Sequence, residues 1–272
     1  MKRNILIIAT TIIGVALMSC TINLDGESFG GETIKGNGNV VTRVVDVTAF
    51  DGVSNSLSAT VNFSISDKYS CTVSVDENIF DYLDIKVKDD DLLIGRKKGQ
   101  KSITLQATQF VIEVTAPRLE DVNLAGSGMF NALSPIEGKE LDVNLAGSGD
   151  IVFKETVTVQ EIDLTVAGSG DLTCNELIAE KLDCNVAGSG DLKVARGKVR
   201  KAEAGVAGSG DIVLSCDIEN LEANIAGSGD IKARVSGKLT YGIFGSGTIG
   251  YYGNPVVEGD KIGPSKVNRL GE

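Results

Sequence analysis

Residues 141–151 read Leu-Asp-Val-Asn-Leu-Ala-Gly-Ser-Gly-Asp-Ile, and this pattern recurs through the second half of the chain. Its central tetrapeptide, Ala-Gly-Ser-Gly, is called the cassette here. Six copies and a seventh with Phe in place of Ala begin at Ala125, Ala146, Ala167, Ala187, Ala207, Ala226 and Phe244. The intervals between them are 21, 21, 20, 20, 19 and 18 residues. A repeat whose period shrinks this slowly indicates one structural unit stacked upon itself.

Apolar and polar residues alternate around each cassette. Leu141, Val143 and Leu145 share one parity, and Asp142 and Asn144 share the other. Period-two alternation predicts β-strands with one buried and one solvent-exposed face. The cassette glycines fall in the buried phase, where a residue without Cβ allows a sharp bend or a close approach of two backbones. A helix is disfavoured because each glycine would cost about 1 kcal/mol in a helix interior.

The period of about twenty residues decides between two all-β architectures. A β-propeller needs about 40 residues for each four-stranded blade, which one copy of the repeat cannot supply. We therefore predict a parallel β-helix, or β-solenoid, with about 20-residue coils over residues 116–255. Its coils would lie about 4.8 Å apart, with the cassettes stacked along one edge and Leu, Val and Ile filling the interior.

The regions on either side of the repeat have different patterns. Residues 40–115 lack the cassette but keep strand-like alternation, as at Val61, Phe63 and Ile65. We predict a β-rich N-terminal region that is either a cap or a set of earlier, longer turns, and the second interpretation is favoured. After Pro255 the pattern fades, so residues 256–272 are expected to be a polar C-terminal tail.

The N-terminus resembles a lipoprotein signal. Lys2 and Arg3 precede an apolar run that is too short for an ordinary membrane span, and it ends at Ala16-Leu17-Met18-Ser19-Cys20, an order that resembles a bacterial lipobox. We expect residues 1–19 to be a signal peptide, Cys20 to carry the lipid that binds the membrane, and residues 20–39 to be a glycine-containing tether. The alternative is an ordinary secretory signal with a cysteine beside its cleavage site.

Residue 21 bears on the membrane that the lipid would enter. In well-studied lipoproteins an Asp after the lipidated Cys retains the protein in the inner membrane, and here that residue is Thr21. The sequence therefore favours a lipid-anchored protein of the outer membrane. It leaves open whether the protein faces the periplasm or the cell surface.

Motifs in both halves of the chain resemble one family. They are VVDVTAF at 44–50 with Gly52 and Val53, SVDENIFDYL at 74–83, DLLIG at 91–95, and the serial AGSGD cassettes. In this order, over about residues 38–250, they resemble the head GIN domain family of putative autotransporter adhesins. The resemblance implies an exported and often lipid-anchored protein of Bacteroidota, with a repetitive β-helical fold and an adhesive role. It implies no catalytic residues.

Composition excludes several classes of function. The chain has 26 Lys plus Arg against 37 Asp plus Glu, a net charge of −11, so we expect no nucleic-acid partner. It has no His, which excludes Ser-His-Asp and Cys-His catalysis and zinc sites with His ligands. Glycine accounts for 33 of 272 residues, well above the usual share of about 7%.

One acidic residue follows the cassette in five copies: Asp150, Asp171, Asp191, Asp211 and Asp230. In stacked coils these carboxylates form a row that repels itself unless it is solvated or neutralised. The functional interpretation is calcium binding, because the related motif Gly-Gly-x-Gly-x-Asp binds calcium in nonapeptide β-rolls. The structural interpretation, which the different spacing favours, is that each Asp accepts hydrogen bonds from turn N–H groups or from a serine of an adjacent coil.

Three other residue types could carry chemistry. The seven cassette serines have no histidine beside them and are expected to form a hydrogen-bonding ladder. Cys71, Cys174, Cys184 and Cys216 could form two disulfides, but we favour small buried side chains. The last tyrosines of the repeat could contact a glycan, although an aromatic cap on the last hydrophobic layer is favoured: Tyr241, Tyr251 and Tyr252.

The sequence favours a non-enzymatic adhesin or ligand-binding scaffold whose partner is a host or envelope glycan or protein. An envelope-structural lipoprotein without an external ligand is the first alternative. A polysaccharide-degrading β-helix enzyme is the second, and it is disfavoured because no inserted loop with carboxylates or basic residues interrupts the repeat. The oligomeric state is left open.

Overall fold

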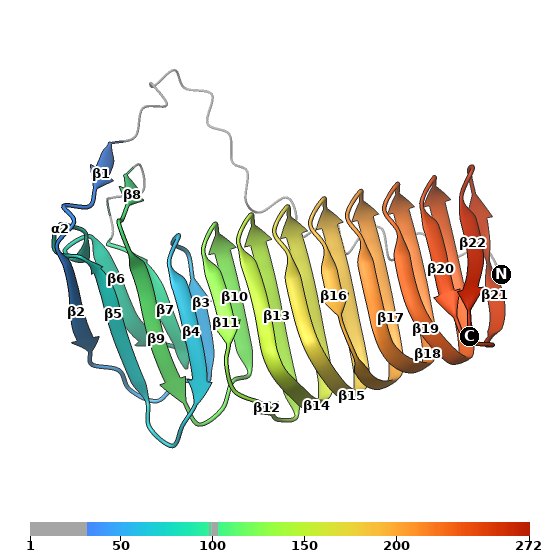
Figure 1. Cartoon of the computed structure of the whole chain (residues 1–272), viewed down its shortest axis with the longest axis horizontal. Coiled ribbons are helices and arrows are strands. Elements are labelled where there is room, and N and C mark those ends of the chain that lie inside the picture. Colours follow the sequence, from blue (N-terminus) through green and yellow to red (C-terminus); the bar gives the residue numbers. More distant parts are fainter. Residues whose placement is uncertain (1–31, 98, 100–102) are drawn as a thin grey trace.

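The protein is a rod of parallel coils with antiparallel strands at its N-terminal end, as a computed structural model of the chain shows (Figure 1). The structure describes residues 32–97, 99 and 103–272. The expected signal peptide, Cys20 and most of the expected tether lie outside these residues. No helix among the described residues is long and apolar enough to cross a membrane.

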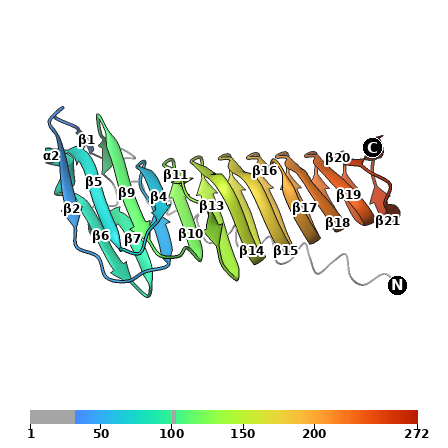
Figure 2. The ribbon, with the colours of Figure 1, turned by 60° about the horizontal axis from the view of Figure 1, so that its bottom comes forward.

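Each coil contributes one strand segment to each of two sheets, which we name face A and face B. Figure 2 shows the two stacks from a second direction. Face A pairs, in order, β6 (Leu83–Lys88), β7 (Asp91–Arg96), β3 (Gly52–Asn55), β10 (Asp121–Gly126), β13 (Glu140–Gly147), the second parts of β14 (Asp150–Gly168) and β15 (Leu172–Gly188), β17 (Gly197–Gly208), the second parts of β18 (Ile212–Gly227) and β19 (Ile231–Gly245), and β21 (Val256–Ile262).

Face B is built in the same way from the segments that follow each cassette. It pairs β2 (Val40–Val45), β5 (Ser70–Asp76), β9 (Phe110–Ala116), β4 (Thr60–Ile65), β11 (Met129–Ala132), the first parts of β14 and β15, β16 (Leu192–Val194), the first parts of β18 and β19, β20 (Thr248–Tyr252) and β22 (Lys266–Gly271). A short strip starting at β12 (Ile136–Glu137) joins the two faces opposite the cassettes.

The predicted solenoid is confirmed, and its cassettes stay in register although the coils shorten. Gly126 pairs with Gly147, and the same position pairs from coil to coil through Gly245. Where coils differ in length, the register shifts in the bend after face B, for instance between Phe153 and Thr156. Lost residues therefore come from the bends, while both sheets and the cassette edge remain aligned.

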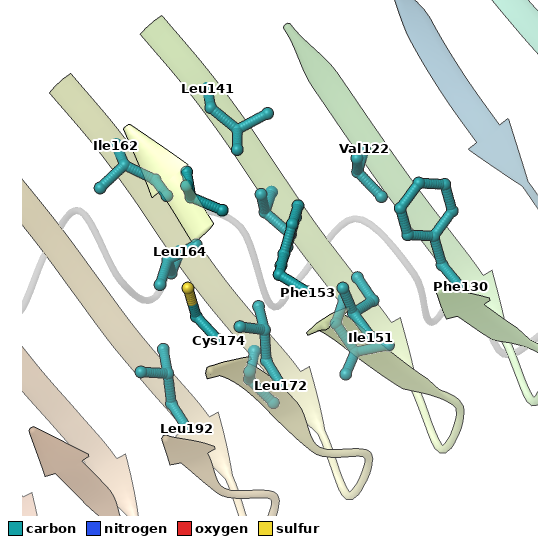
Figure 3. Packing of buried hydrophobic residues seen from close by; sticks show 14 of the residues in the cluster. Val122, Phe130, Leu141, Ile151, Phe153, Ile162, Leu164, Leu172, Cys174 and Leu192 are labelled. Carbon is teal, nitrogen blue, oxygen red and sulfur yellow. The ribbon is translucent and has the colours of Figure 1, made fainter. Parts of the chain in front are cut away.

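The interior is filled by inward rows of the two faces (Figure 3). On face B, Phe63, Ala132 and Phe153 lie in one row, and the Phe130 ring of the neighbouring row occupies the space that the alanine leaves. The Phe130 ring centroid lies 6.3 Å from that of Phe63 and 6.4 Å from that of Phe153. The row then continues with Cys174, Val194, Leu214 and Ala233 and ends at Tyr251.

The N-terminal region is β-rich, as predicted, but only part of it belongs to the solenoid. β3 and β4 stack in parallel register on β10 and β11 and so form a genuine first coil. β2, β5 and β6 instead run antiparallel to their neighbours, next to the short helix α2 (Glu77–Phe80) and the two-stranded sheet of β1 (Thr33–Lys35) and β8 (Thr104–Gln106). β7 and β9 also stack in parallel on β3 and β4. The expectation of earlier, longer turns therefore holds for these four strands and is wrong for β2, β5 and β6, where antiparallel pairing terminates the stack.

The expected polar tail at residues 256–272 is a further coil. β21 pairs with β19, and β22 pairs with β20, both in parallel. Gly263, Pro264 and Ser265 stand where the cassette would be, since Gly263 follows Gly245 by one coil length and lies against its carbonyl oxygen. The polar composition reflects the terminal position of this coil, whose outer surface contacts solvent.

The cassette glycines are required by two separate constraints. The first glycine of each cassette has a φ between 134° and 156°, a region that L-residues with a side chain rarely adopt. The second glycine lies so close to the preceding coil that a Cβ at Gly170 would stand 1.9 Å from the carbonyl oxygen of Gly149. No side chain can move aside there, because the opposing atom belongs to the backbone.

We predict that Gly190→Ala destabilises the rod by about 3 kcal/mol, the upper part of the usual range for overpacked sites. The new Cβ would lie 2.1 Å from the Gly170 carbonyl oxygen. Chemical denaturation followed by circular dichroism measures the loss. Ser189→Ala is the matched control in the same cassette, because the Ser189 side chain is exposed. Equal stability of the two variants would contradict the close-packing account.

Candidate functional site

The aspartates that follow the cassettes form one continuous ladder at the cassette edge. The N–H of Asp171 donates to Oδ1 of Asp150 at 3.1 Å, and the same bond links Asp171 to Asp191, Asp191 to Asp211 and Asp211 to Asp230 at 2.8–3.0 Å. The last step uses the N–H of Thr248 at 2.8 Å. Each carboxylate thus satisfies a backbone donor of the following coil, as the structural interpretation of this row predicts.

The geometry of this ladder bears on the calcium alternative. A calcium ion takes six to eight oxygen ligands, usually from several carboxylates and carbonyl groups that converge on one point. Here successive carboxylates follow the rod one coil apart. Among the described residues no group of three or more acidic or cysteine side chains is arranged to hold a metal ion. The hydrogen bonds of the ladder engage its carboxylates in the fold.

The cassette serines lie on the outside of the same edge. Their backbone N–H groups donate to the first cassette glycine of the preceding coil, for example from Ser169 to Gly147 at 2.9 Å. Among the hydroxyl groups, those of Ser228 and Ser246 lie 3.2 Å apart. In the part of the chain that the structure describes, none of them is hydrogen-bonded to a basic side chain, so activation of a serine nucleophile has no structural support.

The tyrosines at the end of the repeat do not form a single site. Tyr241 on face A and Tyr251 on face B are half-buried and pack against the hydrophobic core, in register with Ala223 and Ala233. Their rings therefore fill the space that small side chains leave in the last coils. Tyr252 is exposed, and its ring centroid lies 5.4 Å from the Arg234 guanidinium carbon.

The four cysteines have free, buried thiols. Cys174 and Cys184 lie on inward rows of faces B and A, in keeping with the interpretation as small core side chains. Burial raises the pKa of the Cys71, Cys174 and Cys216 thiols to about 12. The thiolate that reacts or binds metal is therefore scarce at neutral pH.

A row of acidic side chains runs along the outer surface of face A, and sequence reasoning missed it. The register pairs each member with the next, and the row consists of Asp121, Asp142, Asp163, Asp183, Glu203 and Glu222. A neighbouring row, two positions further along each strand, contains the amides of Asn123, Asn144, Asn185 and Asn224. Aligning the copies on their cassettes and comparing the columns before each Ala would have revealed both rows.

The two halves of the acidic row differ in charge balance. Toward the C-terminus, lysines on the same strands neutralise it, since Lys181 lies 2.7 Å from Asp183 and Lys201 lies 2.6 Å from Glu203. Toward the N-terminus, the corresponding positions are the acidic residues Glu140 and Glu161. We name this half the acidic patch, and it comprises Asp91, Asp121, Glu140, Asp142, Glu161 and Asp163.

Partial burial and the closeness of the carboxylates within the patch raise the pKa of two of them. Partial burial and the charges of Asp183 and Asp142 raise the pKa of Asp163 to about 6, although Lys181 acts against them. Partial burial and the Asp142 charge also raise the pKa of Asp121. Oδ1 of Asp142 is buried and has no hydrogen-bond partner among the described residues. The patch is thus a surface of concentrated and incompletely neutralised negative charge.

Two hollows mark the surface. One lies between β8 and the cassette edge, where Arg96 faces Ser58, Ser127 and the Phe110 ring. The other follows the strip between the two faces and is lined by Val159, Ile178 and charged side chains. The second hollow holds hydroxyl groups and carboxylates, but the Ser236 hydroxyl donates to the carbonyl oxygen of Ile218 at 3.2 Å. No residue of the acidic patch lines either hollow.

Comparison with known proteins agrees with this architecture. Residues 49–175 and 142–255 match the family model described as putative auto-transporter adhesin, head GIN domain. The chain belongs to this family. The matched residues include the antiparallel strands β5 and β6 as well as the coils. A comparison with curated proteins gives no match.

Solved structures of family-like proteins share the whole rod. A protein of Parabacteroides distasonis titled a putative lipid binding protein is 32% identical, with a TM-score of 0.84 over 88% of this chain and 100% of its own. A putative adhesin from Parabacteroides merdae is 28% identical, with a TM-score of 0.82 over 88% of this chain and 100% of its own. A putative adhesin from Parabacteroides distasonis is 28% identical, with a TM-score of 0.81 over 87% of this chain and 99% of its own.

The raised pKa of Asp163 predicts how stability depends on pH. A carboxyl group whose pKa is higher in the folded than in the unfolded protein binds its proton more tightly when folded, so folding is favoured as the pH falls through about 6. We expect the melting temperature to rise between pH 7 and about pH 5, and Asp163→Asn to raise it at pH 7 and reduce this pH dependence. Thermal melting over a pH series measures both effects.

The exposed Asp67, which lies outside the acidic row, supplies the control for this measurement. Asp67→Asn removes the same charge and is expected to leave the pH dependence as it is in the wild type. If Asp163→Asn and Asp67→Asn gave the same pH profile, crowding within the row would not be the cause.

Proposed function

We propose that this protein is a lipoprotein of the outer membrane, anchored through Cys20, whose rod acts as a non-enzymatic adhesin or ligand-binding scaffold. The observation that carries the proposal is the acidic patch on face A, which presents the same chemistry on successive coils of a rigid stack. Two structural relatives are described as putative adhesins, which supports the adhesive role. The glycines 26, 30 and 31 support a tether between lipid and rod. The expected tether is shorter than residues 20–39, because β1 pairs with β8 and the N–H of Gly38 donates to Asp76, which makes residues 33–39 part of the folded N-terminal end.

The charge of the patch favours one kind of partner. When ionised, its carboxylates can accept hydrogen bonds and form ion pairs with cations, but they cannot donate hydrogen bonds. The adjacent amides of Asn123 and Asn144 can both donate and accept hydrogen bonds. A partner surface that carries ammonium or guanidinium groups is electrostatically complementary to it. We therefore infer that the protein or glycan that binds here carries positive charge along its contact surface.

The proposal includes no catalytic step. Acid–base catalysis on a glycan needs two carboxyl groups on opposite sides of the bond that is cleaved, at about 5–10 Å from each other. The acidic residues of face A instead project from one nearly flat sheet surface. This arrangement suits the binding of an extended partner better than the enclosure of a bond.

One experiment on intact cells tests location and adhesion together. Cells that express the wild type are treated with protease, and the loss of full-length protein is followed by immunoblot. We expect cleavage on unbroken cells and, for Cys20→Ala, release of the protein from the membrane fraction. The same cells should bind to a surface coated with a lysine-rich polypeptide, and this binding should weaken as salt is added.

Variants separate specific binding by the patch from general surface charge. Neutralising it with Asp121→Asn, Asp142→Asn and Asp163→Asn should reduce cell binding at least tenfold. The matched control removes three carboxylates elsewhere, with Asp67→Asn, Glu180→Gln and Glu219→Gln, and should leave binding within twofold of the wild type. Protection from protease until the cells are lysed would contradict the adhesin proposal in favour of the envelope-structural alternative.

A further inference from the structure

The last coil of the rod ends in two strands that each have one free edge. β21 pairs only with β19 and β22 pairs only with β20, so the opposite edge of each strand has no strand partner among the described residues. Figure 1 shows both strands in red at the end of the stack. Their unpaired N–H and C=O groups form a template for adding further strands. Unlike the N-terminal end, this end has no antiparallel strand beside it in the part of the chain that the structure describes.

Apolar side chains gather at the same end. Val256 is 62% exposed, Ile262 is 65% exposed and Leu270 is 45% exposed, and Phe244 of the preceding coil is 66% exposed. Phe244 and Ile262 are register neighbours on face A. Adjacent exposed apolar side chains indicate a surface that another molecule covers. The exposed apolar side chains indicate an interface, and the free strand edges indicate that a partner binds there by strand pairing.

Charge is divided between the two free strands. β21 carries Glu258, which lies 2.7 Å from the Lys238 ammonium, and Asp260, which has no ion-pair partner among the described residues. Its one cation, Lys261, donates to the carbonyl oxygen of Ser265 at 3.1 Å. β22 carries Lys266 and Arg269, neither of which has an ion-pair partner among the described residues. One free strand is therefore acidic at its edge and the other is basic. A polar cap that only keeps the end soluble would not require this division.

The directions of the strands limit how two ends can meet. β21 runs toward the cassette edge and β22 runs away from it, because the turn at Gly263 and Pro264 lies between them. A two-fold axis parallel to the strands places β21 of each copy antiparallel to β22 of the other copy, so the dimer contains two equivalent β21–β22 pairs. A two-fold axis across the strands instead pairs β21 with β21 and β22 with β22. Only the first arrangement brings acidic strands beside basic ones.

We propose that the C-terminal coil is a homodimer interface in which β21 of each copy pairs with β22 of the other, joining two rods end to end. The pairing continues face A of one copy into face B of its partner. It covers the free strand edges and places the partner's strands beside the exposed side chains of Val256, Ile262 and Leu270. The two cassette edges then lie on the same side of the dimer, and both acidic patches remain accessible.

Light scattering coupled to gel filtration tests this on the full chain with Cys20→Ala, which removes the proposed acylation site. We expect the mass of a dimer, with dissociation on dilution. Lys266→Glu with Arg269→Glu makes both strands acidic and should weaken the dimer at least tenfold. Adding Asp260→Arg to that variant should restore part of the affinity, because the charges are then exchanged between the strands.

The matched control reverses two lysines on earlier coils of face B, Lys154→Glu in β14 and Lys193→Glu in β16, and should leave the dimer intact. Melting curves of all variants show whether the last coil stays folded. A monomeric wild type at all concentrations would overturn the proposal. A dimer that Lys266→Glu with Arg269→Glu does not weaken would also overturn it. That result would indicate pairing of β22 with β22, in which the substitutions only replace repulsion between cations by repulsion between carboxylates.

Discussion

The contact on which the rod depends is the one between the cassette glycines and the backbone of the coil before them. At Gly149, Gly170 and Gly190 the position of a Cβ would lie 1.9–2.2 Å from a carbonyl oxygen of the preceding cassette. Because the backbones approach so closely, they fix the position of each coil relative to the coil that precedes it. The sheets on both sides then inherit a register that the coil length alone could not set, because the coils shorten along the chain.

Register determines the rest of the molecule in turn. Because like positions stack, inward rows become continuous hydrophobic ladders, and Phe130 can fill the space beside Ala132. Outward positions become rows of one chemistry, as in the aspartate ladder at the cassette edge and the acidic row of face A. The carboxylates of the aspartate ladder accept hydrogen bonds from the backbone of the next coil. The acidic row of face A lies on the outer surface of its sheet. The same constraint thus produces both stability and the surface available for binding.

The sequence predicted most of the solenoid because its signals are local. Alternation around Leu141 and the glycine pairs of the cassettes can be recognised within a single copy. The acidic patch could not be seen in the same way, because its members are about twenty residues apart and become neighbours only through register. The last coil was missed because its cassette has become Gly263-Pro264-Ser265, although the coil length is kept. The antiparallel end depends on pairings such as β2 with β5, which no local pattern encodes.

Native-state hydrogen exchange measured by mass spectrometry tests most directly whether the cassettes hold the rod together. The backbone N–H groups of Ser169, Gly170, Ser189 and Gly190 donate to glycine carbonyl groups of the preceding cassettes. If cassette stacking sets the register, these amides open only when the whole rod unfolds, and they exchange as slowly as the central strands. Exchange at the rate of an exposed loop, with the neighbouring strands still protected, would contradict the account.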